Sequence, residues 1–293
     1  MRWRADDRTR SPLDNRIVSF AAEEAMSGPP GRAARHRLTW VGHSTVLLEV
    51  DGLRLLTDPV LRPRVLHLQR VGSALRLDEH GPDVVLISHV HYDHLDLASL
   101  RLLGGSPRFV VPRGAGRLLR SRGFDDIVEV APGDEEQIRG ITIRATHAEH
   151  DSRRGPFGIE TPALGYLVTG PASTYFAGDT DLFAGMNSIA DDLDVALLPV
   201  AGWGPRLPPG HLNPRTAAEA LALLRPRIAV PIHWGTYRRL GLTRDPLKVR
   251  EPAESFARFA ADLVPAVDVR IVPVGGSLDL KSGATAERSG SDR

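Results

Sequence analysis

The stretch DVVLISHVHYDH, residues 83–94, joins an apolar run to a dense group of polar side chains. Its first half, residues 83–88, is almost entirely apolar, and it is too short for a typical buried helix. Such a run is typical of a strand that is buried on both faces of a sheet. The stretch therefore predicts a central strand whose end delivers the polar side chains to the edge of a sheet.

Four side chains of the metal-binding type, His89, His91, Asp93 and His94, occupy the six positions after this strand. Positions two apart face the same way in extended backbone, so His89 and His91 can bind one ion together. Asp93 and His94 follow after the chain turns and can face a neighbouring ion. Imidazole and carboxylate ligands suit zinc, iron or manganese. The density of these side chains favours a metal site over a polar surface loop.

The rest of the chain has the pattern of a mixed α/β protein. Asp51-Gly52 lies between two apolar runs and predicts a tight hairpin. Asn213 and Pro214 predict the cap and first turn of a helix. The predicted strands are 37–41, 45–50, 53–57, 83–88, 127–130, 141–146, 163–168, 174–177, 195–200, 228–232 and 267–273, and the predicted helices are 97–103, 115–122, 214–224 and 252–263. This order indicates an α/β or α+β fold, and two sheets with helices outside each would account for it.

Composition excludes several classes of function. The chain has 293 residues, 37 basic and 36 acidic side chains and no cysteine, which excludes disulfides, thiolate metal ligands and a cysteine nucleophile. A net charge of +1 disfavours a nucleic-acid surface. We find no apolar run long enough to span a membrane and no secretory signal in the first residues, so we expect a cytoplasmic protein without membrane contact.

Three regions follow from the distribution of apolar residues. Residues 1–36 are rich in Arg, Pro, Gly and Ala and predict an N-terminal extension. Residues 37–280 carry all the predicted strands and helices and form one domain. Residues 281–293 contain no large apolar side chain and predict a disordered tail.

The motif His89-x-His91-x-Asp93-His94 after an apolar strand resembles the metal signature of the metallo-β-lactamase superfamily. The resemblance spans roughly residues 37–280. It implies a four-layer αββα sandwich with the site at one edge, between the sheets. The superfamily's remaining motifs follow in order along the chain. The opening motif resembles that of one branch of the superfamily, which contains N-acyl-phosphatidylethanolamine-hydrolysing phospholipases D and L-ascorbate-6-phosphate lactonase-like hydrolases. These matching segments are Trp40–Thr45, His147 or His150, Gly178-Asp179-Thr180 and Pro231–Tyr237 with His233.

The third histidine of the pattern has two candidates. His150 with Arg154 resembles the His-x-x-x-Arg pattern of that branch, although Asp151 stands where tryptophan is common. His147 lies three residues earlier, closer to the end of the predicted strand. We choose His150 and leave His147 as a supporting or structural residue.

The resemblance implies a centre of two divalent ions. One ion takes three histidines, the other takes Asp93 with two histidines, and Asp179 bridges them. We expect zinc, with manganese or iron(II) as alternatives, and a metal-bound hydroxide as nucleophile. Two ions, two carboxylates and a hydroxide leave about one positive charge, which suits an anionic substrate. The predicted ligands are His89, His91, Asp93, His94, His150, Asp179 and His233.

Further residues are candidates for catalysis and substrate binding. Besides Asp93, we assign a catalytic role to His211, which precedes the capped helix and has the chemistry to protonate a leaving group. Its alternative is an ordinary loop histidine. The predicted substrate-binding residues are His43, Arg153, Trp203 and Tyr237. Alternatively, His43 is an ordinary buried histidine, Arg153 is an exposed arginine, and the two aromatic residues belong to the core.

These residues predict a hydrolase that cleaves a phosphodiester, a phosphorylated lactone or a similar small anionic ester. The gaps between successive ligands, 56, 29 and 54 residues after His94, His150 and Asp179, leave no room for the inserted domain of related nucleases. Only 60 residues follow His233, too few for the flavin domain of the oxygen-reducing relatives. The alternatives are a carboxylic ester or lactone hydrolase without phosphate, and a metal-binding protein without catalysis. Oligomerisation is left open.

Overall fold

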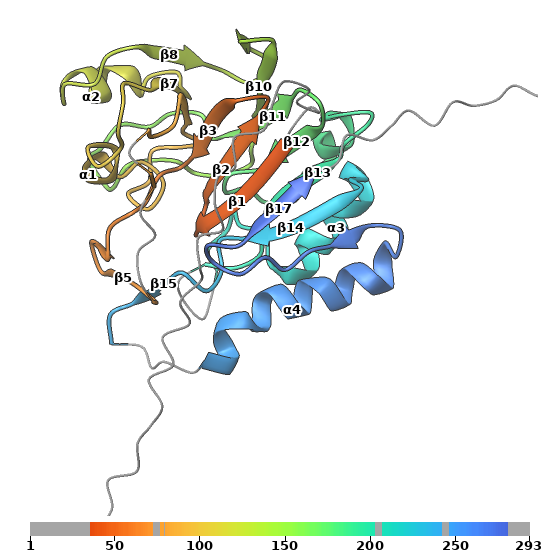
Figure 1. The fold of residues 1–293 in the computed structure, drawn as a ribbon. Coiled ribbons are helices and arrows are strands. Elements are labelled where there is room, and N and C mark those ends of the chain that lie inside the picture. The colour runs from red at the N-terminus through yellow and green to blue at the C-terminus, as the bar shows by residue number, and fades with distance from the viewer. Residues whose placement is uncertain (1–35, 73–76, 79, 203–206, 242–245, 281–293) are drawn as a thin grey trace, which may run out of the picture. The chain divides into compact units, whose positions relative to one another are not determined.

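Two seven-stranded sheets and a small third sheet form the framework of the protein (Figure 1). The computed structural model describes residues 36–72, 77–78, 80–202, 207–241 and 246–280. The predicted tail at 281–293 and, apart from His36, the predicted extension at 1–36 lie outside these residues.

The first sheet has the order β17-β1-β2-β3-β6-β7-β8. Pairing is antiparallel from β17 to β3 and parallel from β3 to β8. The strands are β17 (Ser277–Leu280), β1 (His36–Gly42), β2 (Thr45–Val50), β3 (Leu53–Thr57), β6 (Val84–Leu86), β7 (Arg108–Pro112) and β8 (Ile127–Val130).

The second sheet has the order β16-β14-β13-β12-β11-β10-β9, and the small sheet has the order β15-β5-β4. In the second sheet β16 to β12 are parallel and β12 to β9 antiparallel. The strands are β16 (Asp268–Val269), β14 (Ile228–Ile232), β13 (Val195–Pro199), β12 (Ser173–Phe176), β11 (Leu164–Thr169), β10 (Ile141–His147) and β9 (Glu135–Ile138), then β15 (Tyr237–Arg239), β5 (Leu68–Arg70) and β4 (Arg64–Val65).

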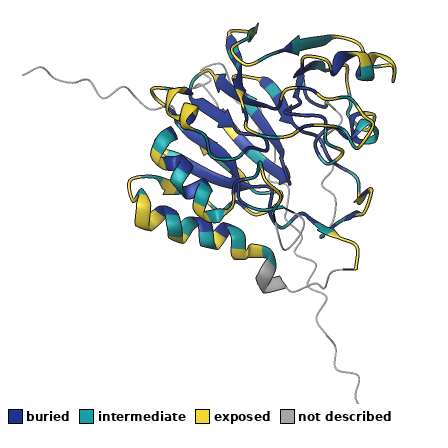
Figure 2. Cartoon of the chain, turned by 180° about the vertical axis from the view of Figure 1, so that it is seen from behind, coloured by how far each residue is buried: buried dark blue, intermediate teal, exposed yellow. Residues whose placement is uncertain are grey.

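Helices cover the outer faces of the sheets. α3 (Pro214–Leu224) and α4 (Pro246–Leu263) lie side by side against the second sheet, and α4 is exposed along its outer side (Figure 2). α1 (Leu97–Leu100) and α2 (Gly116–Arg120) pack on the first sheet, and a short 3₁₀ helix spans Ala184–Ser188. The predicted four-layer αββα sandwich is confirmed.

The central strand is buried on both faces, as the sequence predicts. Val84 and Leu86 of β6 belong to the core between the two sheets, which also contains Phe176 of β12. The alternate residues Val85 and Ile87 face the other way and pack against α1 and α2. Because side chains alternate along a strand, one short apolar run contributes both to the core between the two sheets and to the core between the first sheet and its helices.

Local signals in the sequence place two elements correctly. The Asp51-Gly52 hairpin is confirmed: both residues have positive φ, 49° and 86°, which matches the twist of the paired strands β2 and β3. Asn213 caps α3, since its side chain accepts from the backbone of Thr216, whose hydroxyl accepts from the Asn213 backbone in return.

Other predictions of elements were wrong in detail. α4 begins at Pro246 rather than Pro252, which lies inside the helix, because Pro246 itself fits a first helical turn. The strand predicted over 267–273 is reduced to β16, where only two residues pair with β14. Strands β4, β5, β7, β9, β15 and β17 are not in the prediction, because they are short and lack a sustained alternation of apolar residues.

Candidate metal centre

The predicted ligands gather where strands of both sheets end. His89 follows β6, Asp179 follows β12 and His233 follows β14. The two sheets are joined at this end, because the Leu164 amide at the start of β11 donates a 2.9 Å hydrogen bond to the Ser88 carbonyl. Loops that leave adjacent strand ends therefore meet in one place, between the sheets.

Three histidines form a first group of potential ligands. The Nδ1 atom of His91 lies 3.1 Å from Nε2 of His89 and 3.1 Å from Nε2 of His150. These three nitrogen atoms lie within 4.8 Å of one another, a spacing that lets them bind one ion. His89 is fully buried, while His91 and His150 are half-buried.

A second group lies beside the first. The Nε2 atoms of His94 and His233 are 3.3 Å apart, and Oδ2 of Asp93 lies 3.9 Å from Nε2 of His94. His43, which we predicted to bind substrate, is part of this group: its Nε2 lies 3.2 Å from Oδ2 of Asp93.

Asp179 lies next to ligands of the second group and to His211. Its Oδ2 atom is 3.1 Å from Nε2 of His94 and 3.4 Å from Nε2 of His211. Its Oδ1 atom is 3.3 Å from Nε2 of His233 but accepts no hydrogen bond from the described residues, although the carboxylate is buried. A buried carboxylate oxygen without a hydrogen bond fits a cation between these side chains.

Hydrogen bonds behind the histidines fix how they face the centre. Nδ1–H of His150 donates to the Gly210 carbonyl at 2.8 Å, and Nδ1–H of His233 donates to the Ala201 carbonyl at 2.5 Å. A proton held on Nδ1 leaves the lone pair on Nε2, and in both residues Nε2 faces the group of ligands. This arrangement is typical of metal-binding histidines.

Asp58, a residue that the sequence analysis missed, supports one histidine of each group. It is fully buried, and its Oδ2 accepts from Nδ1–H of His94 at 2.7 Å. It also accepts from the Ser88 amide at 2.7 Å and the Ser88 hydroxyl at 2.5 Å, and that hydroxyl accepts from Nδ1–H of His89 at 2.9 Å. Its signal is a carboxylate directly after β3, the strand that pairs with β6.

Arg154 closes the ligand loop instead of facing the centre. Its Nη1 donates to the carbonyls of Val90 at 2.6 Å and Leu95 at 2.9 Å, which bracket the turn that carries the ligands. Its guanidinium lies 4.1 Å from the centre of the Tyr92 ring. The arginine of the His-x-x-x-Arg pattern therefore links the loop of His150 to the loop of the other ligands.

For His89, His150 and Asp179 the surroundings favour the protonation states that metal binding requires. Burial lowers the pKa of His89, and it lowers the pKa of His150 to about 4, which keeps both rings neutral. Burial acts to raise the pKa of Asp179, but the neighbouring His233 and His94 outweigh it and hold the pKa well below its usual range. Neutral imidazoles and an ionised carboxylate are the forms that bind metal.

His94 carries a proton when no cation is present. Burial acts to lower its pKa, but the charge and hydrogen bond of Asp179 and the hydrogen bond of Asp58 raise it well above the usual value. A cation near Nε2 would replace that proton and balance the same carboxylates. The donor set therefore fits divalent metal.

The remaining predicted residues lie in different places. His211 is close to the first group, with its ring edge-on to His150 at 4.7 Å between centroids. His147 is half exposed, pairs with Glu149 at 3.2 Å, and its ring packs edge-on to Phe183.

Besides His43, the predicted substrate-binding residues lie in different surroundings. Arg153 is exposed and pairs with Glu160 of its own loop. Tyr237 is buried, donates from its hydroxyl to the Arg62 carbonyl at 2.6 Å and packs edge-on to His43. Trp203 lies outside the described residues.

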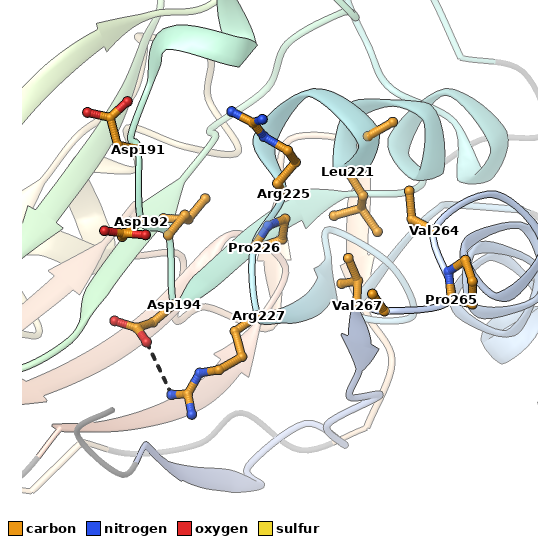
Figure 3. A pocket seen from close by; sticks show the side chains of 13 residues that line it. Asp191, Asp192, Asp194, Leu221, Arg225, Pro226, Arg227, Val264, Pro265 and Val267 are labelled. Carbon is orange, nitrogen blue, oxygen red and sulfur yellow. Dashed lines mark ion pairs between the residues drawn. The ribbon is translucent and has the colours of Figure 1, made fainter. Parts of the chain in front are cut away.

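A separate hollow of about 690 Å³ lies at the opposite end of the second sheet (Figure 3). Asp194 and Arg227, which form a 3.2 Å ion pair there, directly precede β13 and β14, whereas His233 follows β14. Leu221 of α3 and Val267 contribute apolar surface. No predicted ligand is among the described residues that line it.

Comparison with known proteins agrees with this geometry. Residues 53–234 match the family described as "Beta-lactamase superfamily domain". A protein of Methanopyrus kandleri named as a metal-dependent hydrolase is 32% identical over 251 residues, which cover 83% of this chain and 99% of the relative. A metallo hydrolase structure from Ignicoccus hospitalis is 25% identical, with a TM-score of 0.63 over 84% of this chain and 98% of that one.

The chain therefore belongs to the metallo-β-lactamase superfamily. An uncharacterised protein of Mycobacterium tuberculosis is 38% identical over 229 residues, 71% of this chain and 61% of the relative, so the match spans about three fifths of that relative's length. An N-acyl-phosphatidylethanolamine-hydrolysing phospholipase D of Caenorhabditis elegans is 29% identical over 77% of this chain and 70% of that protein. No helix among the described residues is long and apolar enough to cross a membrane.

Proposed function

We propose that the protein is a two-metal hydrolase that cleaves a phosphodiester bond in a small anionic substrate. The observation that carries the proposal is the pair of adjacent ligand groups with Asp179 beside them. The first ion would be held by His89, His91 and His150. The second would be held by Asp93, His94 and His233. Zinc fits this set of imidazole and carboxylate ligands best.

Divalent ions bound here would supply an activated water and stabilise the negative charge that develops on the ester oxygen. Asp179 would hold the two ions together, because its carboxylate lies beside His94 and His233 of the second group and within 4.8 Å of the ligand nitrogen of His150 in the first. His211 would hold the proton that the leaving group needs. Burial acts to lower its pKa, but the hydrogen bond and charge of Asp179 outweigh this and raise the pKa, which favours the protonated ring that an acid needs.

The substrate class is supported by charge and by similarity. The centre with its ions is positive overall, which favours an anionic phosphodiester over a neutral ester. The phospholipase D relative from Caenorhabditis elegans is by its name a hydrolase of a phospholipid. A phosphorylated lactone would use the same ligands. So would a lactone or carboxylic ester without phosphate, which the assay below distinguishes from a phosphodiester.

The test combines metal analysis with a substrate panel. We expect two ions per chain in purified protein and turnover of bis(4-nitrophenyl) phosphate that exceeds turnover of 4-nitrophenyl acetate and simple lactones. Asp179→Ala should lose both ions together, whereas Asp194→Ala, at the opposite end of the second sheet, should retain them. Faster hydrolysis of the ester or lactone would reassign the substrate. Full metal content without turnover of any substrate would support a non-catalytic metal-binding protein.

A further inference from the structure

His43 has a backbone conformation that few residues of its type adopt. It follows Gly42 in the tight connection between β1 and β2, with φ of 56° in the left-handed region. Such a conformation costs about 1–3 kcal/mol outside glycine and persists only when the surrounding structure enforces it. His233, a predicted ligand, has φ of 64° and is also left-handed.

Three hydrogen bonds hold His43 in this conformation. Its amide donates to the Thr236 hydroxyl at 2.7 Å, and its carbonyl accepts from the Trp40 indole at 2.9 Å. The same carbonyl accepts from the His233 amide at 3.0 Å. The turn of the first sheet is therefore attached to the backbone of a ligand that belongs to the second sheet.

The side chain of His43 contacts ligands from both sheets. Its Nε2 lies 3.2 Å from Oδ2 of Asp93, in the loop after β6, which is a hydrogen-bond distance. Its ring lies over the ring of His233, after β14, with 3.9 Å between centroids and 34° between planes. The side chain is only 2% exposed, so water does not compete for these contacts.

We propose that His43 is a positioning residue of the second ion: it donates a hydrogen bond to Asp93 and supports the ring of His233. The inference rests on the proposed two-ion centre. Nε2 of His43, which could otherwise bind an ion, lies at hydrogen-bond distance from Oδ2 of Asp93, so we assign it as a donor to Asp93 and not as a ligand. Its hydrogen bond to Oδ2 of Asp93 would instead fix how that carboxylate is turned toward the ion.

Two substitutions separate the hydrogen bond from the fold. His43→Gln keeps a donor, because the amide nitrogen of glutamine reaches about as far as Nε2 of histidine, whereas His43→Leu removes it. Both variants bear the same left-handed backbone, so their difference reports the side chain.

Cobalt(II) titration of the metal-free full chain, followed by absorption, resolves the two ions. For His43→Leu we expect the second ion to bind about 10- to 100-fold more weakly, with the first unchanged. His43→Gln should stay close to wild type.

Binding of both ions by His43→Leu with wild-type affinity would overturn the proposal. Equal losses of metal affinity in the two variants would also overturn it, because they would indicate that His43 is itself a ligand. Thermal unfolding of the metal-free variants checks the fold. If His43→Leu does not fold, Thr236→Val, which removes the acceptor of the His43 amide, should weaken the same ion, and an unchanged affinity would refute the idea. Two ions without turnover in wild type would refute only the proposed function, whereas a wild type without metal would overturn both.

Discussion

Replacement of Asp58 by asparagine tests whether a single buried carboxylate supports both halves of the centre. Both oxygens of Asp58 act as acceptors: Oδ1 from the Ser88 amide, and Oδ2 from the Ser88 hydroxyl and from His94. Asparagine keeps one acceptor oxygen and replaces the other by an NH₂ donor. Whichever way the amide turns, one buried N–H group then faces another donor.

The two orientations have different costs. With NH₂ in place of Oδ1, the Ser88 amide loses its acceptor, and an unsatisfied buried donor costs about 1–3 kcal/mol. With NH₂ in place of Oδ2, His94 must move its proton from Nδ1 to Nε2, and the lone pair that should bind metal is lost. Loss of such supporting contacts typically weakens metal binding about 10- to 100-fold. We therefore expect Asp58→Asn to show both a lower melting temperature, by a few degrees, and weaker binding of at least the second ion.

The assay is a competition titration with a chromophoric zinc chelator, combined with thermal unfolding of the metal-free protein. Asp194→Asn is the matched control, because Asp194 also accepts a backbone hydrogen bond, from Ser173 at 2.9 Å, but lies at the opposite end of the second sheet. It should change the melting temperature only. Wild-type affinity for both ions in Asp58→Asn would refute the argument, whatever happens to the melting temperature.

Three further predictions concern single histidines. His150→Ala should lose one ion and nearly all activity while His147→Ala stays mild; the opposite ranking in metal content would make His147 the ligand. His211→Ala should slow alkyl leaving groups much more than nitrophenolate, with metal content intact; equal slowing of both would exclude the acid role. Burial lowers the pKa of His36 in the folded chain below its ordinary value of 6.5. As the pH falls through 6.5, the unfolded chain therefore takes up a proton before the folded chain does, and the stability present above pH 6.5 is lost. In metal-free protein, His36→Leu should therefore reduce the loss of melting temperature between pH 7.5 and 5.5, and an unchanged slope would contradict this.

Much of the fold could be predicted because its signals are local. The Asp51-Gly52 turn depends on two residues that accept positive φ, and the Asn213 cap depends on contacts within one helical turn. Strand β17 shows the limit of such signals. Its residues alternate weakly, and it forms because β1 offers an unpaired edge far away in the sequence, with Leu38 opposite Leu278.

The candidate site likewise has a part that local sequence signals predict and a part that depends on contacts between distant residues. The ligand-type residues of the loop after β6 were visible because they crowd into six positions, and the structure brings His150, Asp179 and His233 beside them. Asp58 and Arg154 were not recognisable in these roles. Their partners, His94 and the Leu95 carbonyl, are separated from them by 36 and 59 positions, so only the packed sheets show the contacts.

The position of the centre couples metal binding to the packing of the two sheets. Asp93 and His94 leave the first sheet, whereas Asp179 and His233 leave the second, so an ion held by all of them would cross-link the sandwich at one edge. The described hydrogen bonds already make the same connection, from the His233 amide to the His43 carbonyl. A ligand that binds only the folded state raises the free energy of unfolding, and this gain grows with the logarithm of the ligand concentration divided by the dissociation constant. The two sheets would therefore position the proposed ions, and the ions in return would hold the ends of the two sheets together.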